Sequence, residues 1–385
     1  MLTTTQTNLH ATMTHGGETT ERPVNELIVR YDKIVKDRRL QWTTHHRLLK
    51  LLGTGGQGVV YLTELRGADH FTLPVALKFF SPERYEDARA YADAMARIAR
   101  VAARVAQIQH DNLLNIHNFM DRDRIRMMVM EWVDGYDLQR LMVPQMLERI
   151  RTRVSVRRWE YINRVIVTGG PVQPRIKAGV AVAIVRDCLS ALAALHREGV
   201  VHGDIKPSNV MLKRTGSAKI VDIGAAFELE DPPPQRTCTP TYAAPEVLEG
   251  SDITPLSDLA SLGYVLIELL AGRPLFASYT GYKELLEAKR RLPQRLPEIL
   301  PNEVTCNELL MKFCRGLIAP DPMLRFPSAE TAEMHKEGAA GFHRQLVIGD
   351  LASEYPNEIR LWLEELKELD EQGEIEPSGP LSQNL

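Results

Sequence analysis

Three polar side chains that lie close together in the sequence could catalyse the transfer of a phosphoryl group. Asp204, Lys206 and Asn209 stand on one short segment that follows an apolar lead-in. A carboxylate can orient a hydroxyl and accept its proton, a lysine can neutralise a phosphoryl group in transfer, and an amide can bind a metal ion. Asp222 comes eighteen residues after Asp204, at the end of an apolar strand-like run, and its carboxylate suits Mg²⁺.

Upstream, residues 53–61 form a glycine-rich run, Gly-Thr-Gly-Gly-Gln-Gly-Val-Val-Tyr. Glycine lets a backbone approach phosphate oxygens closely, although a glycine-rich hairpin without a ligand has the same pattern. No Lys-Ser or Lys-Thr pair follows the last glycine, which excludes a Walker-type loop. A dinucleotide-binding loop would need a helix next, whereas residues 59–62 predict a strand. We therefore expect a glycine-rich turn between two strands.

Lys78 lies twenty residues after the last of these glycines, at the end of the strand-like run Val75–Lys78. A lysine beside apolar neighbours is usually a solvated strand edge. Near a glycine loop, however, it can supply positive charge to the same phosphates.

The hydrophobic pattern predicts the elements that must hold these groups. Strand-like runs cover roughly Arg47 to Val133, and residues 85–109 between them are alanine-rich with a helical period. From Ala178 onward helices dominate, at 180–197, 258–270 and 303–317. We predict an α+β chain in which a small β-rich lobe precedes a larger helical lobe.

Five motifs follow one another along the chain: the glycine loop, the lysine strand, the 202–209 loop, the 221–224 segment and Thr239–Glu246. In this order they resemble the motifs of the protein-kinase family. The resemblance runs from about Leu49 to about Met334, and the Asp-x-Lys-Pro-x-Asn form is similar to bacterial members of the serine/threonine branch. It implies the two-lobed protein-kinase fold and a serine/threonine kinase that acts on protein substrates. The cofactors implied are ATP and Mg²⁺, with Mn²⁺ as an alternative metal.

The resemblance also divides the chain. It implies a kinase domain over residues 47–335, with an N-lobe at 47–133, a basic insert at 140–177 and a C-lobe at 178–335. Residues 1–22 are expected to be a disordered N-terminal segment and residues 23–46 an N-terminal extension. Residues 336–385 are expected to form an acidic C-terminal extension with an amphipathic helix, whose apolar side carries Ile359, Trp362, Leu363, Leu366 and Leu369.

Roles follow from the resemblance as well. Asp204 would accept the proton of the substrate hydroxyl, Lys206 would neutralise the γ-phosphate, and Asn209 and Asp222 would hold Mg²⁺. The residues expected to bind ATP are the loop glycines, the phosphate-binding lysine, the apolar residues around adenine, the gatekeeper and hinge, and a ribose-binding acid: Gly53, Gly55, Gly58, Val60, Ala76, Lys78, Met130, Glu131, Val133, Asp137 and Met211. Without ATP, core packing alone would explain Val60, Ala76 and Met211. Asp258 and a Glu246–Arg325 pair look structural.

Three positions depart from the family pattern. Gly203 replaces an arginine that receives an activation-loop phosphate in many kinases, which argues against switching by loop phosphorylation. Ile223 replaces a phenylalanine and can fill the same apolar slot. Val101 stands where a helix glutamate should pair with Lys78, and the nearest acid is Asp93. A pseudokinase or ATP-binding scaffold therefore remains the alternative to an active enzyme, and a kinase of small molecules is disfavoured by the intact segment 239–246.

We expect the helix to be held by apolar packing instead of an ion pair. Contact between Lys78 and either Asp93 or Glu86 would overturn this expectation. A displaced helix with Lys78 bonded to Asp222 would favour the inactive alternative.

Composition narrows the remaining classes. The 385 residues carry a net charge of −3, which argues against a nucleic-acid-binding protein. The four cysteines are scattered and predict free thiols. With no secretion signal and no uncharged apolar run of about 18 residues, we expect a cytoplasmic protein without a membrane span.

Two segments of opposite charge stand out. Residues 140–177 carry nine Arg and Lys against two Glu, a net charge of +7, and residues 350–376 carry ten Asp and Glu against one Arg and one Lys, a net charge of −8. The two segments could dock on each other within one molecule or bind a partner, although two independently solvated surfaces would explain them equally well.

Overall fold

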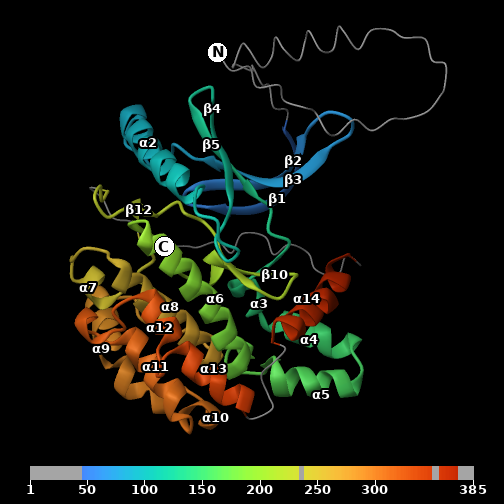
Figure 1. Ribbon diagram of the computed structural model, residues 1–385, viewed down its shortest axis with the longest axis vertical. Coiled ribbons are helices and arrows are strands. Elements are labelled where there is room, and N and C mark those ends of the chain that lie inside the picture. Colours follow the sequence, from blue (N-terminus) through green and yellow to red (C-terminus); the bar gives the residue numbers. More distant parts are fainter. Residues whose placement is uncertain (1–45, 234–237, 349–354, 372–385) are drawn as a thin grey trace, which may run out of the picture. The chain divides into compact units, whose positions relative to one another are not determined.

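The computed structural model describes residues 46–233, 238–348 and 355–371. An antiparallel five-stranded sheet comes first in the chain, and a larger set of helices follows it (Figure 1). The predicted two-lobed α+β fold is confirmed.

The small lobe is built on that sheet. Its strands lie in the order β1-β2-β3-β5-β4, and their bounds are β1 His46–Gly55, β2 Gly58–Arg66, β3 Thr72–Phe80, β4 Ile116–Arg122 and β5 Ile125–Glu131. The central strands β3 and β5 are the most buried, whereas β1 is an edge strand with irregular register. The turn between β1 and β2 is the glycine-rich run, as predicted.

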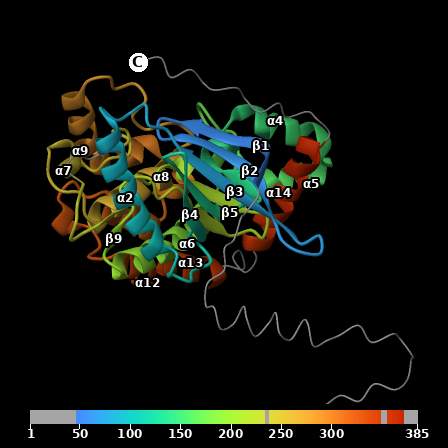
Figure 2. The same ribbon diagram turned by 90° about the horizontal axis from the view of Figure 1, so that it is seen from above.

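Helix α2 (Ala88–Val105) lies beside the sheet (Figure 2). It begins later than predicted because the Asp87 side chain accepts a hydrogen bond from the Ala90 N–H and caps the helix there. Met95, Val101 and Val105 are buried on its inner face. The predicted apolar face of this helix is therefore confirmed.

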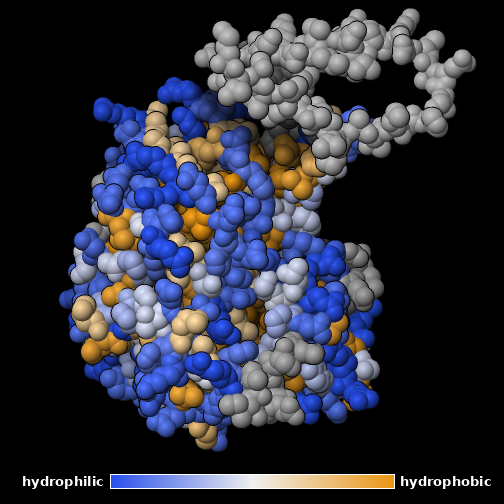
Figure 3. Space-filling view, in the orientation of Figure 1, coloured by the Kyte–Doolittle hydropathy of each residue, from blue (hydrophilic) through white to orange (hydrophobic). Residues whose placement is uncertain are grey.

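Part of the small-lobe surface is apolar. Figure 3 shows hydrophobic side chains gathered over its strands. The exposed members come from β1, β3 and the turn before β3: Leu48, Leu49, Leu51, Leu52, Phe71 and Leu73.

The large lobe packs around two apolar helices, α6 (Ala178–Arg197) and α8 (Pro255–Ala271), which contact each other. Around them lie α7 Pro245–Leu248, α9 Tyr282–Ile299, α10 Asn302–Thr305, α11 Glu308–Ile318, α12 Ala329–Met334 and α13 Ala339–Ile348. The single helix predicted over 303–317 is divided between α10 and α11, because Asn307 caps the second helix by accepting from the Leu310 N–H.

Helix α6 is long and apolar enough to cross a membrane, which the sequence analysis did not expect of any segment. Sixty-seven per cent of its most apolar stretch is buried inside the protein. A core helix surrounded by other helices is hydrophobic on all sides, so this composition does not establish a membrane span.

The segment that joins the two lobes in the sequence is largely helical. It contains β6 Gly135–Asp137, α3 Leu138–Leu141, α4 Pro144–Arg153, α5 Val156–Val165, β7 Val167–Thr168 and β8 Arg175–Ile176. The C-terminal helix α14 (Tyr355–Glu371) lies beside α4 (Figure 1). Four of its predicted apolar residues are buried: Ile359, Trp362, Leu363 and Leu366.

Candidate active site

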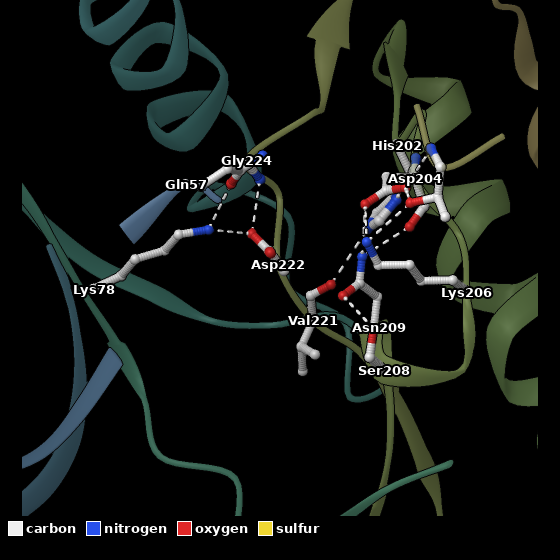
Figure 4. A network of polar contacts seen from close by, with 11 residues as sticks. Gln57, Lys78, His202, Asp204, Lys206, Ser208, Asn209, Val221, Asp222 and Gly224 are labelled. Carbon is white, nitrogen blue, oxygen red and sulfur yellow. Dashed lines mark hydrogen bonds and ion pairs between the residues drawn. The ribbon is translucent and has the colours of Figure 1, made fainter. Parts of the chain in front are cut away.

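The catalytic side of the site is a loop in the large lobe. The loop runs from β9 (Val200–Val201) through the short helix η1 (Pro207–Asn209) into β10 (Val210–Lys213). Lys206 Nζ lies 2.7 Å from Asp204 Oδ2. Asn209 Nδ2 donates to the Asp204 backbone carbonyl at 2.8 Å and to Oδ2 at 3.3 Å (Figure 4). The three predicted groups therefore meet at one carboxylate.

Thr239 approaches the same carboxylate from the activation segment, the stretch from Asp222 to Glu246. Its N–H and its hydroxyl donate to Asp204 Oδ1 at 3.2 and 2.7 Å, and its hydroxyl oxygen accepts from Lys206 Nζ at 3.0 Å. Thr239 therefore contacts both of the predicted catalytic residues. Thr237, a second threonine of this segment, lies outside the described residues.

A buried aspartate braces the loop from α8. Asp258 is 1% exposed and accepts from the backbone N–H groups of His202 and Gly203, both at 2.9 Å. Gly203 has φ +74°, a left-handed conformation that costs glycine little. The structural role predicted for Asp258 is confirmed.

A second structural pair holds the end of the activation segment. Arg325 donates to both carboxylate oxygens of Glu246, each at 2.7 Å, and its side chain is fully buried. Such two-point pairing fixes geometry as well as charge. The predicted Glu246–Arg325 ion pair is confirmed.

On the nucleotide side, Lys78 reaches across from β3 to the segment that follows β11 (Ala218–Ile220). Its Nζ donates to Asp222 Oδ1 at 2.6 Å and to Gln57 Oε1 at 2.8 Å (Figure 4). Burial alone would raise the pKa of the Asp222 carboxyl, but the adjacent Lys78 ammonium holds that pKa below its usual value. The Asp222 carboxylate is thereby kept ionised, as a metal ligand must be.

Helix α2 supplies no acid to Lys78 in the described structure, whose partners for this lysine are Asp222 and Gln57. Val101 occupies the expected position and is buried. Asp93 lines a cavity of about 470 Å³ between α2 and the segment after Asp222. The expectation that packing fixes the helix therefore holds. The Lys78–Asp222 contact, however, is one of the two features, together with a displaced helix, that were expected of the inactive alternative.

Gln57 is the residue of this site that the sequence did not single out. It lies between Gly56 and Gly58 in the loop, and a glutamine at this position does not by itself predict that the side chain turns toward Lys78. The flanking glycines were the one available signal, because they let the backbone place this side chain inside the site.

The loop glycines lie at the turn between β1 and β2. Gly53 and Gly55 end β1 and Gly58 begins β2. Gly58 has φ +133°, and a Cβ there would stand 1.9 Å from the Phe79 carbonyl oxygen, so only glycine fits. A Cβ on Gly53 or Gly55 would meet nothing within 4 Å, which leaves open space over these two residues.

Val60, Ala76 and Met130 lie on neighbouring strands of the small-lobe sheet, whereas Met211 lies on β10. Val60 pairs with Lys78 across β2 and β3, and Ala76 pairs with Met130 across β3 and β5. Ala76 and Met130 are buried, whereas Val60 and Met211 are half-buried.

The hinge and the ribose position have other partners. The Glu131 carboxylate forms an ion pair with Lys219 and accepts from the Asn115 N–H at 2.9 Å, so this residue can offer only its backbone to adenine. Val133 is buried at the hinge. The Asp137 carboxylate caps α3 by accepting from the Arg140 N–H at 2.8 Å, and burial raises its pKa. Its role at the ribose stays a prediction.

The predicted metal ligands fit a divalent cation. The Asn209 amide nitrogen is committed to Asp204, and the amide oxygen, which accepts a long hydrogen bond of 3.5 Å from the Ser208 hydroxyl, keeps a lone pair for coordination. The Val221 N–H donates to the Asn209 carbonyl at 2.9 Å, so Asp222 follows directly on a segment bonded to Asn209. Within the described ranges no group of three or more His, Cys, Asp or Glu side chains is placed so that it could hold a metal ion. A cation held by one carboxylate and one amide would complete its shell with substrate phosphates.

Comparison with known proteins adds to this geometry. The family model described as "Protein kinase domain" matches residues 46–336. The chain is similar to serine/threonine-protein kinase PrkC of Bacillus subtilis, with 28% identity over 75% of this chain and 39% of the relative. It is also similar to serine/threonine-protein kinase PkaA of Streptomyces coelicolor, with 31% identity over 65% of this chain and 43% of the relative.

A third relative is serine/threonine-protein kinase PknD of Mycobacterium tuberculosis, with 31% identity over 74% of this chain and 38% of the relative. The chain thus spans about two fifths of the length of the curated relatives that it matches. The family model covers well over half of the chain, and the motifs of that family lie together in space around Asp204 and Lys78. The chain therefore belongs to the protein kinase family.

Proposed function

We propose that this chain is a serine/threonine protein kinase, which transfers the γ-phosphoryl group of ATP to hydroxyl groups of protein substrates. The observation that carries the proposal is the set of contacts around Asp204, where Lys206, Asn209 and Thr239 converge. A kinase that only bound nucleotide would have no need for this arrangement on the hydroxyl side.

The residues act on the two ends of one displacement. The substrate oxygen attacks the γ-phosphorus, its proton passes to the Asp204 carboxylate, and the bond from that phosphorus to the bridging oxygen breaks to release ADP. Lys206 neutralises the γ-phosphoryl oxygens while Lys78 neutralises the α- and β-phosphates. A bound divalent cation would add Lewis-acid charge neutralisation at the phosphates, and Asn209 and Asp222 would hold it.

Transfer can be tested directly. Purified protein is incubated with γ-labelled ATP, Mg²⁺ and a mixed Ser/Thr peptide substrate, and the labelled residues are mapped. Asp204→Asn should lower transfer by about 10²–10⁴-fold, because it removes the proton acceptor. Unchanged nucleotide binding in this variant is the control. Transfer that survives in Asp204→Asn, or a wild-type protein that transfers nothing, would contradict the proposal.

A pseudokinase is the second candidate, and the Lys78–Asp222 contact is the observation that favours it. In this arrangement the lysine is held by Asp222 where an acid of α2 was expected. Against it stand the five retained polar groups, Lys78, Asp204, Lys206, Asn209 and Asp222, and the relatives, which are named as kinases. The labelling experiment separates the two candidates.

We propose Mg²⁺ as the metal, with Mn²⁺ able to replace it. The all-oxygen donor set of Asn209 and Asp222 supports a hard cation. Chelation should abolish transfer, and readdition of Mg²⁺ or Mn²⁺ should restore it. In Asp222→Asn the nucleotide affinity should no longer depend on the metal. Zn²⁺ as the sole restoring ion would contradict this assignment.

We also propose that the C-terminal segment docks on the basic insert within one molecule. Arg158 of α5 supports this, because it lies 2.7 Å from Glu365 and 3.3 Å from Glu358, and all three side chains are at least partly buried. The burial of Trp362 and Leu363 on α14 supports it more strongly. Arg175 and Lys177 of the insert pair with Glu303 instead of α14, so apolar packing is the stronger support for docking.

Two variants test the docking. Trp362→Ala should lower the free energy of unfolding by about 3–5 kcal/mol. Arg158→Ala should cost about 1 kcal/mol, and this cost should shrink as salt is added. Truncation at Gly349 that leaves the melting temperature unchanged at every salt concentration would contradict docking.

A further inference from the structure

The contact that orients Lys78 comes from an unexpected element. In the described structure α2 offers this lysine an apolar neighbour, Val101, where an acid was expected. The Lys78 ammonium instead donates to Gln57 Oε1 at 2.8 Å, in addition to Asp222 (Figure 4). Gln57 stands at the tip of the glycine loop, between β1 and β2.

The backbone of Gln57 and of the residue after it lies against the end of the strand that carries Lys78. The Ser81 N–H donates to the Gln57 carbonyl at 3.0 Å. The next residue, Gly58, lies so close to the Phe79 carbonyl that a Cβ could not fit. The loop tip is therefore seated on the end of β3, which brings the Gln57 side chain within reach of the lysine.

A second glycine makes room for the amide. A Cβ on Gly224 would stand 1.8 Å from Gln57 Oε1, so this oxygen can reach Lys78 only because residue 224 has no side chain. The Gly224 N–H meanwhile donates to Asp222 Oδ1 at 3.0 Å. The Gln57 amide thus joins the glycine loop, the lysine strand and the metal-binding segment at one point.

The charge of the acceptor matters. An ammonium has three N–H donors, and the contacts with Gln57 and Asp222 use two of them, which leaves one for a phosphate oxygen. The Asp222 carboxylate already offsets part of the Lys78 charge. An amide oxygen fixes the direction of the ammonium without offsetting more of that charge, as a second carboxylate would.

We propose that Gln57 is a positioning residue that holds Lys78 for the nucleotide phosphates, in the role that an acid of α2 was expected to fill. The position of the lysine then depends on the glycine loop and not on α2. The inference rests on the proposed ATP-dependent function, since it assigns a role toward the phosphates.

Calorimetric titration of the full chain with ATP, ADP and adenosine tests it. Gln57→Leu should weaken ATP and ADP binding about 10-fold, the size expected for one hydrogen bond to a charged group. Adenosine affinity should change by less than about 2-fold, because adenosine has no phosphate for Lys78 to bind. Gln57→Asn is too short to reach Lys78 and should behave like Gln57→Leu, whereas Gln57→Glu should keep the contact and lose less ATP affinity than Gln57→Leu, because its carboxylate still orients the ammonium but offsets part of its charge. Asp93→Asn, on α2, is the unaffected control.

A second measurement separates positioning from a general effect on the loop. In a Lys78→Met background, Gln57→Leu should cause less than about 2-fold further loss of ATP affinity, because the residue it positions is gone. An equal loss for adenosine and ATP, a loss that persists beside Lys78→Met, or unchanged or tighter ATP binding by Gln57→Leu would each overturn the assignment. Binding needs no catalysis, so a protein that shows the predicted affinities but transfers no phosphate would refute only the proposed activity.

Discussion

Asp204 and Lys78 stand at the two ends of the proposed reaction, and different kinds of contact hold them. Asp204 lies in a network that spans three parts of the large lobe, namely its own loop, the activation segment through Thr239 and α8 through Asp258. Lys78 is held by two side chains, Gln57 and Asp222, from segments on either side of the nucleotide site. The hydroxyl end is thus fixed by several hydrogen bonds that support one another, whereas the nucleotide end depends on a few contacts that a ligand can exchange.

Helix α2 belongs to the second kind. Its ties to the large lobe are Arg104 with Glu228 at 3.2 Å and Arg100 with Asp231, and these four side chains range from partly to well exposed. Exposed ion pairs contribute little, so burial of Val101 and its neighbours is the main force on this helix. The lysine and the helix can therefore move independently here, which would not be so if an ion pair joined them.

The largest effect is expected from removing the brace on the rigid side. Asp258→Ala removes the acceptor of the buried His202 N–H and of the partly buried Gly203 N–H, at about 1–3 kcal/mol for a buried group and less for the other. Thermal unfolding should show this loss, and phosphoryl transfer should fall with it. Glu298→Ala, an exposed acid on α9, is the matched control and should change neither. An Asp258→Ala protein as stable and active as wild type would remove the distinction between the two ends.

On the nucleotide side, Lys78→Met should weaken ATP binding by about 10–100-fold, because one charge-assisted contact with the phosphates is lost. The melting temperature should fall modestly, because the partly exposed Asp222 carboxylate loses its ion-pair partner. Calorimetry and thermal unfolding on the same sample measure both. Wild-type ATP affinity in this variant would sink the assignment of the nucleotide site.

A smaller effect is expected from thinning the network around Asp204. Thr239→Ala should lower kcat about 10-fold, because its hydroxyl bonds both the Asp204 carboxylate and the Lys206 ammonium. Thr239→Ser keeps the hydroxyl and should retain most activity. If both variants lost activity equally, the methyl group and not the hydrogen bonds would be responsible.

The smallest effect is expected on α2. Asp93→Asn should change kcat/KM by less than about 2-fold, as for an ordinary surface substitution. Val101→Glu should give no gain, because it buries a carboxylate in a site that packing already fills. Steady-state kinetics of both variants would contradict us if Asp93→Asn were inactive or Val101→Glu more active than wild type.

The two ends also differed in how far sequence could predict them. Asp204, Lys206 and Asn209 lie within one short loop, so their spacing alone brings them together. The partner of Lys78 could not be found in this way, because the direction of the Gln57 side chain depends on how the loop tip meets Gly224, far downstream. The period of α14 predicted its buried face but not the surface that covers it. The pairing of Glu131 with Lys219 was missed for the same reason, since it joins β5 to β11.

The apolar composition of α6 also matters when the chain is not folded. Most of the twenty residues of this helix are apolar, and the folded large lobe hides most of these. In a newly made or heated chain the same stretch is open to other chains, to chaperones and to lipid, and it is long enough to be mistaken for a membrane anchor. Loss of this protein on heating should therefore be governed by aggregation through α6, so that recovery after cooling depends on protein concentration and not only on the temperature reached.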